Sequence, residues 1–101
     1  MQMPSYDEYV GEVFEGKAHG MGTYVYRGGK KDACYPVYFG NFLKGERHGP
    51  GCLHYSSTMV LEIGWLCGKP EGPGKLTLNN SKFDVVYANG RRQTKVISAA
   101  E

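Results

Sequence analysis

A short motif recurs along this chain in a fixed order, and its recurrence limits the fold more than any other feature. Alternating aromatic and aliphatic residues precede three glycines spaced G-x-x-x-G-x-G, in three successive copies. The copies begin at Tyr9, Tyr38 and Leu61, and a partial fourth begins at Phe83. A unit this short cannot bury its own apolar side chains, so it must stack on its neighbours. The sequence therefore predicts a repeat array.

Each copy has the pattern of a β-hairpin. In the first strand of the first copy, Tyr9 and Val13 alternate with Val10 and Phe14, which is the period of two expected of a half-buried strand. The strands that return from each turn alternate in the same way. One face is formed by Tyr24, Tyr26, Leu53, Tyr55, Leu76 and Leu78, and the other by Thr23, Val25, Cys52, His54, Lys75 and Thr77. The predicted fold is all-β.

The glycines have distinct predicted roles. The first two in each motif are assigned to a hairpin loop of four to five residues, where a positive φ is needed. The third opens the returning strand, where an aromatic ring from the adjacent strand can cover the bare backbone. Candidates for the covering ring are Tyr9, Tyr38 and Trp65. The residues assigned to these turns are Gly16, His19, Gly20, Gly22, Gly45, His48, Gly49, Gly51, Gly68, Gly72 and Gly74.

The repeats divide the chain into three regions. The array spans residues 9–92, and residues 1–8 are an N-terminal cap or a disordered segment. Residues 93–101 lack the pattern and are assigned to a C-terminal tail, which we expect to act as a short cap because terminal repeats expose an apolar face and an edge strand. Within the array the copies are 9–29, 38–60, 61–82 and the partial 83–92, with an insertion at 27–36.

Composition excludes several classes of protein. The formal net charge of +2 is too small to indicate nucleic-acid binding. The three cysteines, Cys34, Cys52 and Cys67, are odd in number and irregularly spaced, which favours reduced thiols in an intracellular protein. No apolar run approaches the length of a membrane span, and the first residues lack the pattern of a signal peptide. We therefore expect a cytoplasmic protein.

The residues capable of chemistry do not form a known catalytic or metal-binding pattern. His48, Cys52 and His54 offer three possible zinc ligands, with Cys34 or Cys67 as a fourth, but no paired C-x-x-C supports such a site. The serines lack a nucleophile elbow, and the glycine-rich turns lack the lysine and helix of a phosphate-binding loop. We therefore predict no catalytic residue, no metal and no cofactor, and we expect the protein not to be an enzyme.

The combined motif Y-x-G-x-[aromatic]-x-x-G-x-x-H-G-x-G resembles the MORN (membrane occupation and recognition nexus) repeat. The stretch from Tyr9 to Gly22 matches it except at Val13, where the family prefers Trp, and the second copy matches with Phe42 at that position. The third copy departs at Leu61, Ile63 and Glu71, and the resemblance as a whole covers residues 9 to about 92.

The resemblance implies an elongated, twisted, antiparallel single-layer sheet of stacked hairpins without enzymatic activity. His19 and His48 would be the turn histidines of the family. Proteins with such arrays look like scaffolds of cilia, membrane junctions and cytoskeletal assemblies, and some small members hold a myosin tail. The expected function is therefore a scaffold or adaptor that binds a protein, in a cytoskeletal or ciliary (flagellar) assembly, and short arrays of this kind often form homodimers.

The aromatic face of the predicted sheet is the candidate site for a peptide or helix of a partner. Tyrosine and tryptophan are favoured at interfaces, and a single-layer sheet cannot cover both of its faces. The alternative is that the rings pack on neighbouring glycines and fill the concavity of the sheet, with only the outer rings left for contact. The predicted partner-binding residues are Tyr24, Tyr26, Tyr38, Phe42, Tyr55, Trp65 and Tyr87.

An alternative function is peripheral attachment to membranes through anionic phospholipids. Basic residues near an anionic surface contribute about 1 kcal/mol each, so the attachment would be weak and sensitive to salt. The acidic residues near the N-terminus oppose it. The candidate lipid-binding residues are Lys30, Lys31, Arg91, Arg92 and Lys95.

Overall fold

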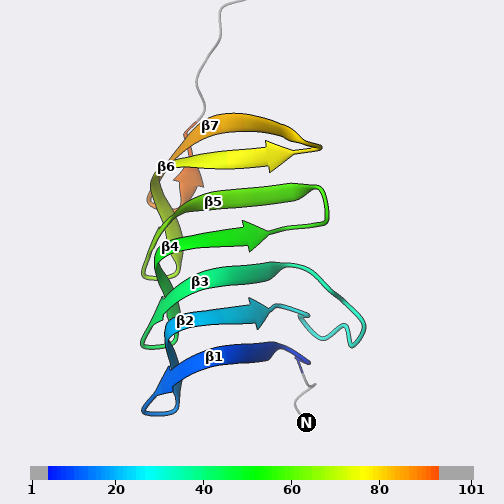
Figure 1. The fold of residues 1–101 in the computed structure, drawn as a ribbon, viewed down its shortest axis with the longest axis vertical. Helices are drawn as coiled ribbons and strands as arrows, with labels where there is room; N and C mark the ends of the chain where they lie inside the picture. The colour runs from blue at the N-terminus through cyan, green and yellow to red at the C-terminus, as the bar shows by residue number, and fades with distance from the viewer. Residues whose placement is uncertain (1–4, 94–101) are drawn as a thin grey trace, which may run out of the picture.

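The structure, a computed structural model, describes residues 5–93 as one open sheet of eight antiparallel strands. The strands follow one another in sequence order, so each pairs with the next (Figure 1). The sheet is elongated, with extents of 55 × 27 × 26 Å, and the described residues contain no helix. The strands are β1 Glu8–Phe14, β2 Lys17–Val25, β3 Val37–Leu43, β4 Glu46–His54, β5 Met59–Leu66, β6 Lys69–Leu78, β7 Ser81–Ala88 and β8 Arg91–Arg92.

These strands confirm the all-β, single-layer sheet of stacked hairpins expected from the sequence. They also confirm which side chains share a face, because Tyr9, Tyr24, Tyr38, Leu53 and Leu61 form one continuous cross-strand row. The expected C-terminal cap falls outside the described residues, and so do the first four residues of the expected N-terminal segment.

The hairpin turns are shorter than the sequence predicted. Each has two residues, as in Glu15 and Gly16, where φ is 50° and 77° and the flanking Phe14 pairs with Lys17. In the turns at Lys44–Gly45, Cys67–Gly68 and Asn89–Gly90, φ is likewise positive at both residues. This is the type I′ turn, whose backbone twist matches that of the strands it joins. The predicted loop of four to five residues is wrong because the strand resumes immediately after the first glycine.

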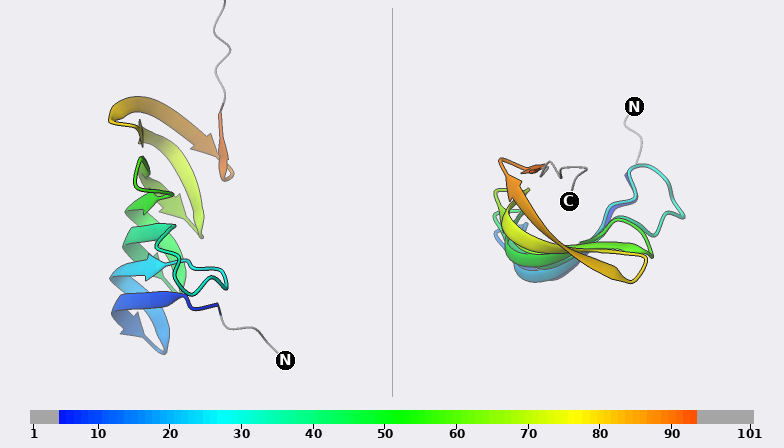
Figure 2. Two further views of the ribbon diagram at one scale, coloured as in Figure 1. Left: turned by 90° about the vertical axis from the view of Figure 1, so that its right-hand side faces the viewer. Right: turned by 90° about the horizontal axis from the view of Figure 1, so that it is seen from above.

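The second glycine of each motif lies inside the returning strand and marks a bulge. Gly20, Gly49 and Gly72 have φ of 86°, 87° and 85°. Beside Gly20 the register slips, since Gly11 pairs with Gly22 but Val13 pairs with Ala18. A bulge bends the bulged strand and increases its twist. Repeated in the hairpins β1–β2, β3–β4 and β5–β6, it folds the sheet into a gutter with a concave and a convex side, seen from above in Figure 2.

The third glycine of the first two motifs lies under a tyrosine ring. A Cβ added to Gly22 would lie 2.5 Å from Cε1 of Tyr9, and one added to Gly51 would lie 2.5 Å from Cε1 of Tyr38. The Tyr38 hydroxyl reaches past the glycine and donates to the carbonyl of Asn41 at 3.0 Å. The predicted cover of glycine by an aromatic ring is confirmed for these two tyrosines.

In the third repeat, the third glycine of the motif is covered by an aliphatic side chain instead of a tyrosine ring. An added Cβ at Gly74 would meet Cγ1 of Ile63 at 2.7 Å, so Ile63 covers this glycine. The proposed cover by Trp65 is wrong. Trp65 lies two residues further along β5, where it is paired with Gly49 of β4 on one side and with Pro70 of β6 on the other. The isoleucine stands where the first two copies have glycine, and its branched side chain fills the space that the tyrosine ring takes there.

The concave side holds the core of the molecule. Its centre is an aromatic cluster in which Tyr38 meets Phe42 and Trp65 edge to face, with ring centroids 5.1 and 5.5 Å apart. Such edge-to-face pairs contribute about 0.5–1.5 kcal/mol beyond the area they bury. The buried residues, all concave-facing, are Tyr38, Phe42, Leu53, Leu61, Ile63, Trp65 and Leu76.

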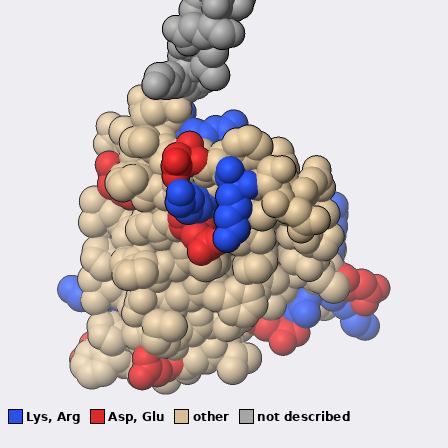
Figure 3. Space-filling model, turned by 45° about the horizontal axis from the view of Figure 1, so that its top comes forward, with Lys and Arg blue, Asp and Glu red and all other residues tan. Residues whose placement is uncertain are grey.

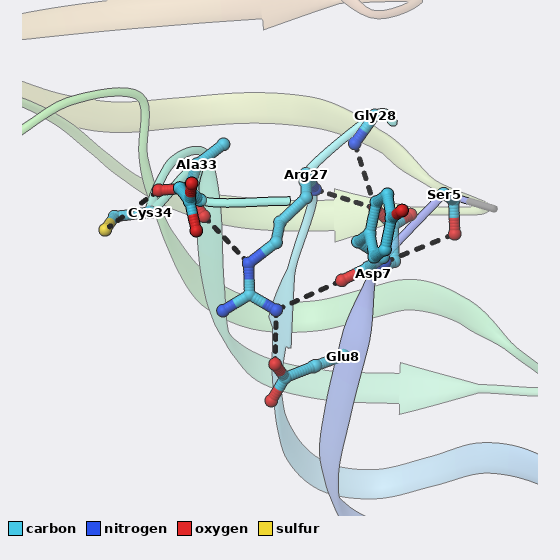
Figure 4. A network of polar contacts seen from close by, with 9 residues as sticks. Ser5, Asp7, Glu8, Arg27, Gly28, Ala33 and Cys34 are labelled. Atoms are coloured by element: carbon cyan, nitrogen blue, oxygen red, sulfur yellow. Dashed lines mark hydrogen bonds and ion pairs between the residues drawn. The ribbon is translucent and has the colours of Figure 1, made fainter. Parts of the chain in front are cut away.

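The insertion between β2 and β3 is tied to the start of the chain by Asp7 (Figure 4). The Asp7 carboxylate accepts from the amides of Arg27 at 2.7 Å and Gly28 at 3.1 Å, and from the Tyr24 hydroxyl at 3.3 Å. The Gly28 amide is the largest cause that holds the pKa of Asp7 below its ordinary value of 3.8, and the Arg27 amide and charge act in the same direction. The ionised carboxylate therefore fastens this loop.

The Arg27 side chain completes the attachment. Its Nε donates to the carbonyl of Ala33 at 2.8 Å, and its Nη1 donates to the carbonyl of Tyr6 at 3.0 Å and forms an ion pair with Glu8. One guanidinium thus joins the far end of the insertion to the entry of β1. Residues 5–8 and the insertion are therefore one connected unit at this end of the sheet.

We expect Asp7→Asn to loosen the insertion without unfolding the sheet. The variant loses the negative charge that the Arg27 and Gly28 amides solvate, and an exposed charge-assisted hydrogen bond contributes on the order of 1 kcal/mol. Trypsin cleavage after Lys30 and Lys31 at neutral pH should therefore accelerate by about fivefold. Glu15→Gln, a charge removal in the exposed turn between β1 and β2, is the control and should leave the cleavage rate unchanged.

The same carboxylate makes the insertion sensitive to acid. Because the pKa of Asp7 is depressed in the folded protein, its contribution is present above the ordinary value of 3.8 and is lost as the pH falls through the lower, folded value. Hydrogen-exchange protection of the Gly28 amide should therefore fall below about pH 4 in the wild type. Protection that is equal in wild type and Asp7→Asn across this range would show that the carboxylate does not hold the loop.

Candidate interaction faces of the sheet

The predicted partner-binding residues all face the concave side, but they differ in accessibility. Tyr38, Phe42 and Trp65 are 0%, 4% and 4% exposed, so their first role is in the core. Tyr24, Tyr26, Tyr55 and Tyr87 are half-buried around this cluster. The structure therefore divides the aromatic stripe into a central part that fills the concavity and a rim that a partner can touch.

Arg47 lies over the rings of the concave side. Its Cζ is 4.4 Å from the ring centroid of Trp65, 5.5 Å from that of Tyr26 and 5.8 Å from that of Tyr38. Arg47 belongs to β4, beside the hairpin turns, whereas Tyr26 follows β2 at the other arm of the gutter. The guanidinium therefore reaches across the concavity and joins the two arms through cation–π contacts.

Two backbone contacts hold Arg47 in this position. Its Nη2 donates to the carbonyl of Gly68 at 2.8 Å, and its own carbonyl accepts from the Gly68 amide at 2.9 Å. Gly68 is in the turn between β5 and β6, so the arginine is anchored to the next hairpin of the stack. Arg47 was not among the residues predicted for the site. The signal available for it was an arginine at a concave-facing position of the alternation, next to the aromatic positions.

The hydroxyls of Tyr24, Tyr26 and Tyr55 are neutral at physiological pH. Burial raises the pKa of Tyr24, Tyr26 and Tyr55 above the ordinary value of 10.0, and it raises the pKa of Tyr38 to about 12. The positive charge of Arg47 opposes this rise at Tyr26, Tyr38 and Tyr55 without reversing it. The rim therefore presents hydroxyl groups able to donate hydrogen bonds beside a permanently positive guanidinium.

The convex side carries exposed apolar residues that the sequence analysis did not single out. Val10, Met21 and Phe39 are 73%, 57% and 45% exposed. They line a shallow groove of about 510 Å³, and a second groove of about 540 Å³ adjoins it at Pro50 and Cys52. Figure 3 shows broad uncharged surface around a central group of acidic and basic side chains, with further charged side chains at the edges of the view. These positions were missed because the alternation identifies two faces without deciding which is buried.

The candidate lipid-binding residues do not gather on one surface. Lys30 and Lys31 are exposed in the insertion between β2 and β3, whereas Arg91 and Arg92 form β8 at the opposite end of the strand order (Figure 1). Lys95 lies outside the described residues. The two described groups therefore act as separate basic sites on a sheet 55 Å long.

The residues considered for zinc binding or catalysis have structural surroundings. Nδ1 of His48 accepts from the amide of Cys67 at 3.5 Å, and the ring of His54 meets Phe39 edge to face at 5.1 Å. Within residues 5–93, no three side chains of His, Cys, Asp or Glu lie close enough to hold a metal ion together. The same residues include no helix that could cross a membrane.

The chain folds as a repeat protein: an open sheet of stacked hairpins, in which aromatic rings pack on glycines and most aromatic side chains lie on the concave face. Such a sheet exposes two large faces to possible partners. The family model of the MORN repeat matches residues 9–31, 38–59 and 64–82, which is more than half of the chain. The chain belongs to the MORN repeat family. This is a non-catalytic family of repeat scaffolds, commonly engaged in interactions with proteins or membranes. No curated protein matches the chain.

Proposed function

We propose that this protein is a cytoplasmic, non-enzymatic scaffold that binds a protein partner on the concave face of its sheet, as part of a cytoskeletal or ciliary assembly. The proposal depends on one observation: half-buried tyrosines of the rim, including Tyr26, Tyr55 and Tyr87, surround the aromatic core. The partner contributes a peptide or a helix that lies along the gutter. Membership of a family of repeat scaffolds supports the proposal.

The chemistry of the two faces favours the concave one. Energetically dominant residues at protein interfaces are enriched in Trp, Tyr and Arg, whereas Leu and Val are under-represented. The concave side offers tyrosines held in place by a packed core, so little side-chain entropy is lost on binding. The convex side offers Val10, Met21 and Phe39, which lie more exposed, and the polar side chains at their groove include Thr23 and Asn41 but no Tyr, Trp or Arg.

Selection of peptides on the intact protein tests the proposal. A library of random short peptides displayed on phage is selected on the wild type, and the affinity of the chosen peptides is measured by titration calorimetry. We expect Tyr55→Ala and Tyr87→Ala each to weaken binding by about tenfold or more, the effect of removing a well-packed interface side chain. Met21→Ala and Phe39→Ala, on the convex side, are the matched controls and should change affinity by less than about twofold.

The opposite pattern would contradict the proposal. If the selected peptides lost affinity with the convex substitutions and kept it with the tyrosine substitutions, the binding face would be the convex one. Thermal unfolding of each variant separates loss of contact from loss of structure. A variant of the rim that melts like the wild type but binds more weakly reports on the interface alone.

Self-association is a form of the same proposal in which the partner is a second copy. Light scattering over a range of concentrations measures it directly, and a molar mass that stays at that of one chain would exclude a homodimer.

Binding to anionic lipid is the second candidate, favoured by the exposure of Lys30, Lys31, Arg91 and Arg92. Because each cation contributes about 1 kcal/mol near the surface, the separated groups would give weak, salt-sensitive attachment. Flotation with phosphatidylcholine vesicles containing phosphoinositide, at low salt, tests it. Failure to float with the vesicles would reject this function.

A further inference from the structure

We infer that the partner presents an acidic side chain, Asp or Glu, to Arg47, so that this arginine anchors the partner at the centre of the concave face. The inference rests on the proposed function and deepens it by naming the chemistry of the partner. It starts from the charge distribution of the sheet. At the concave-facing positions of β3–β7, Arg47 is the one charged side chain.

Arg47 has no acidic partner within the described part of the chain. Residues 5–93 contain two ion pairs, Arg27 with Glu8 and Lys75 with Asp84, and Arg47 takes part in neither. The Asp7 carboxylate acts on the Tyr26 hydroxyl but forms no ion pair with Arg47, and it accepts from the amides of Arg27 and Gly28. Within residues 5–93, the positive charge of Arg47 therefore has no ion-pair partner.

The surroundings of Arg47 make a carboxylate an effective ligand. The guanidinium is half-buried against the rings of Trp65, Tyr26 and Tyr38, which reduces its contact with water. Of its N–H donors, one is used by the Gly68 carbonyl. A guanidinium has five donors in a planar fork, and two parallel donors fit the two oxygens of a carboxylate. Because the arginine is already fixed by its stacking and by Gly68, little conformational entropy is lost when it binds.

The rim adds donors of the same kind. Tyr26 and Tyr55 lie close enough to Arg47 for its charge to act on their hydroxyls, and Arg92 acts on Tyr55 from β8. Neutral hydroxyls next to a fixed positive charge complement a negative group and its neighbouring carbonyls, whereas a basic partner would meet like charge. Charge complementarity therefore identifies the occupant of this face as an acidic segment of a protein.

The test uses peptides selected on the wild-type protein, examined for a fixed acidic position. We expect the selected sequences to share one Asp or Glu flanked by apolar residues. Replacing that residue by Asn or Gln in the peptide should weaken binding to the unmodified protein by about 10- to 100-fold, the range for a desolvated charge pair at an interface. This change leaves the fold of the protein untouched.

Substitution of the arginine provides the reciprocal measurement. Arg47→Met keeps an unbranched apolar side chain over Trp65 and removes the charge, and we expect the same 10- to 100-fold loss. The two changes together should cost little more than either alone, since they remove one interaction. Arg91→Met, which removes an exposed arginine from β8, is the control and should leave affinity within about twofold.

The outcomes separate this inference from the proposed function. Peptides that depend on Tyr55 and Tyr87 but share no acid, or that bind Arg47→Met as tightly as wild type, would overturn the inference and leave the scaffold function in place. Peptides indifferent to Tyr55 and Tyr87 would overturn both. If no acidic peptide is selected, and phosphoinositide-containing vesicles bind in a manner abolished by Arg47→Met, the ligand of Arg47 is a lipid and the inference is wrong.

Discussion

Trp65→Ala should lower the free energy of unfolding by about 3–5 kcal/mol, the usual range for truncating a buried large aromatic residue. Folded domains of this size are stable by only about 5–15 kcal/mol, so the variant is expected to be barely folded at room temperature. The side chain is 4% exposed at the centre of the core. Its loss would leave a cavity between Tyr38 and Arg47, which both contact its ring.

The substitution would also weaken the contact that Arg47 makes across the concave side. Without the indole face, the guanidinium of Arg47 loses its closest ring and the two arms of the sheet lose a connection. Urea denaturation followed by circular dichroism measures the change. The midpoint of the transition should fall to a lower urea concentration, while the m-value stays close to that of the wild type. Leu66→Ala is the matched control: Leu66 is the next residue, faces the convex side and is 52% exposed, so its truncation should cost less than about 1 kcal/mol.

Trp65→Phe distinguishes packing from hydrogen bonding. Among residues 5–93, Nε1 of Trp65 has no hydrogen-bond partner, so a phenyl ring loses volume but no polar contact. We expect a cost of about 1–2 kcal/mol. A destabilisation equal to that of Trp65→Ala would show that a phenyl ring cannot replace the indole in its contacts with Tyr38 and Arg47.

Gly51→Ala should destabilise the protein by about 1–3 kcal/mol, the range for overpacking a close-packed site. The added methyl group would lie 2.5 Å from Cε1 of Tyr38, whose ring is completely buried and cannot move aside without disturbing Phe42 and Trp65. For a domain of about 100 residues this corresponds to a fall in melting temperature of at least about 4 °C, measurable by calorimetry.

Gly64→Ala is the control for the glycine substitution. Gly64 lies in the neighbouring strand β5, its φ is not positive, and an added Cβ would meet the carbonyl of Glu71 at 3.8 Å, an ordinary contact. We expect little or no destabilisation there, because alanine restricts the unfolded chain more than glycine does. Equal effects at the two positions would mean that the tyrosine ring does not depend on the bare backbone beneath it.

A double substitution tests the pairing of ring and glycine directly. Tyr38→Ala removes the ring that an alanine at position 51 would meet, so Gly51→Ala should cost less in that background than in the wild type. If the two costs simply add, the clash between ring and methyl group is not the cause of the destabilisation.

The local features of the array could be predicted because they depend on neighbours in the same or the adjacent strand. The alternation of side chains identified which of them share a face. The packing of Tyr9 and Tyr38 on glycines could be predicted because each tyrosine and its glycine lie on adjacent, paired strands. Ile63 was missed because the third repeat replaces a glycine with a branched side chain, which changes the space above Gly74. The loop length was missed because the second glycine supplies a bulge instead of a turn.

The candidate site was only partly predictable, for a geometric reason. The sequence placed Tyr24, Tyr26, Tyr55 and Tyr87 on one face together with Tyr38, Phe42 and Trp65, but it could not say which rings bury one another. Their burial depends on how sharply the sheet bends at the bulges, and this bend accumulates over all the hairpins. Arg47 and Tyr26 come from different repeats and opposite arms, so no local pattern could bring them together.

By itself, the amino-acid sequence determined the repeat, the antiparallel strands and the division of side chains between two faces, because these depend on a spacing of two along a strand and on where glycine is needed. The tertiary structure alone decided which face closes upon itself and which stays open. It also decided that a single arginine spans the concave side. These are properties of curvature, and curvature arises when several bulged hairpins stack and bring the two arms of the sheet within reach of one long side chain.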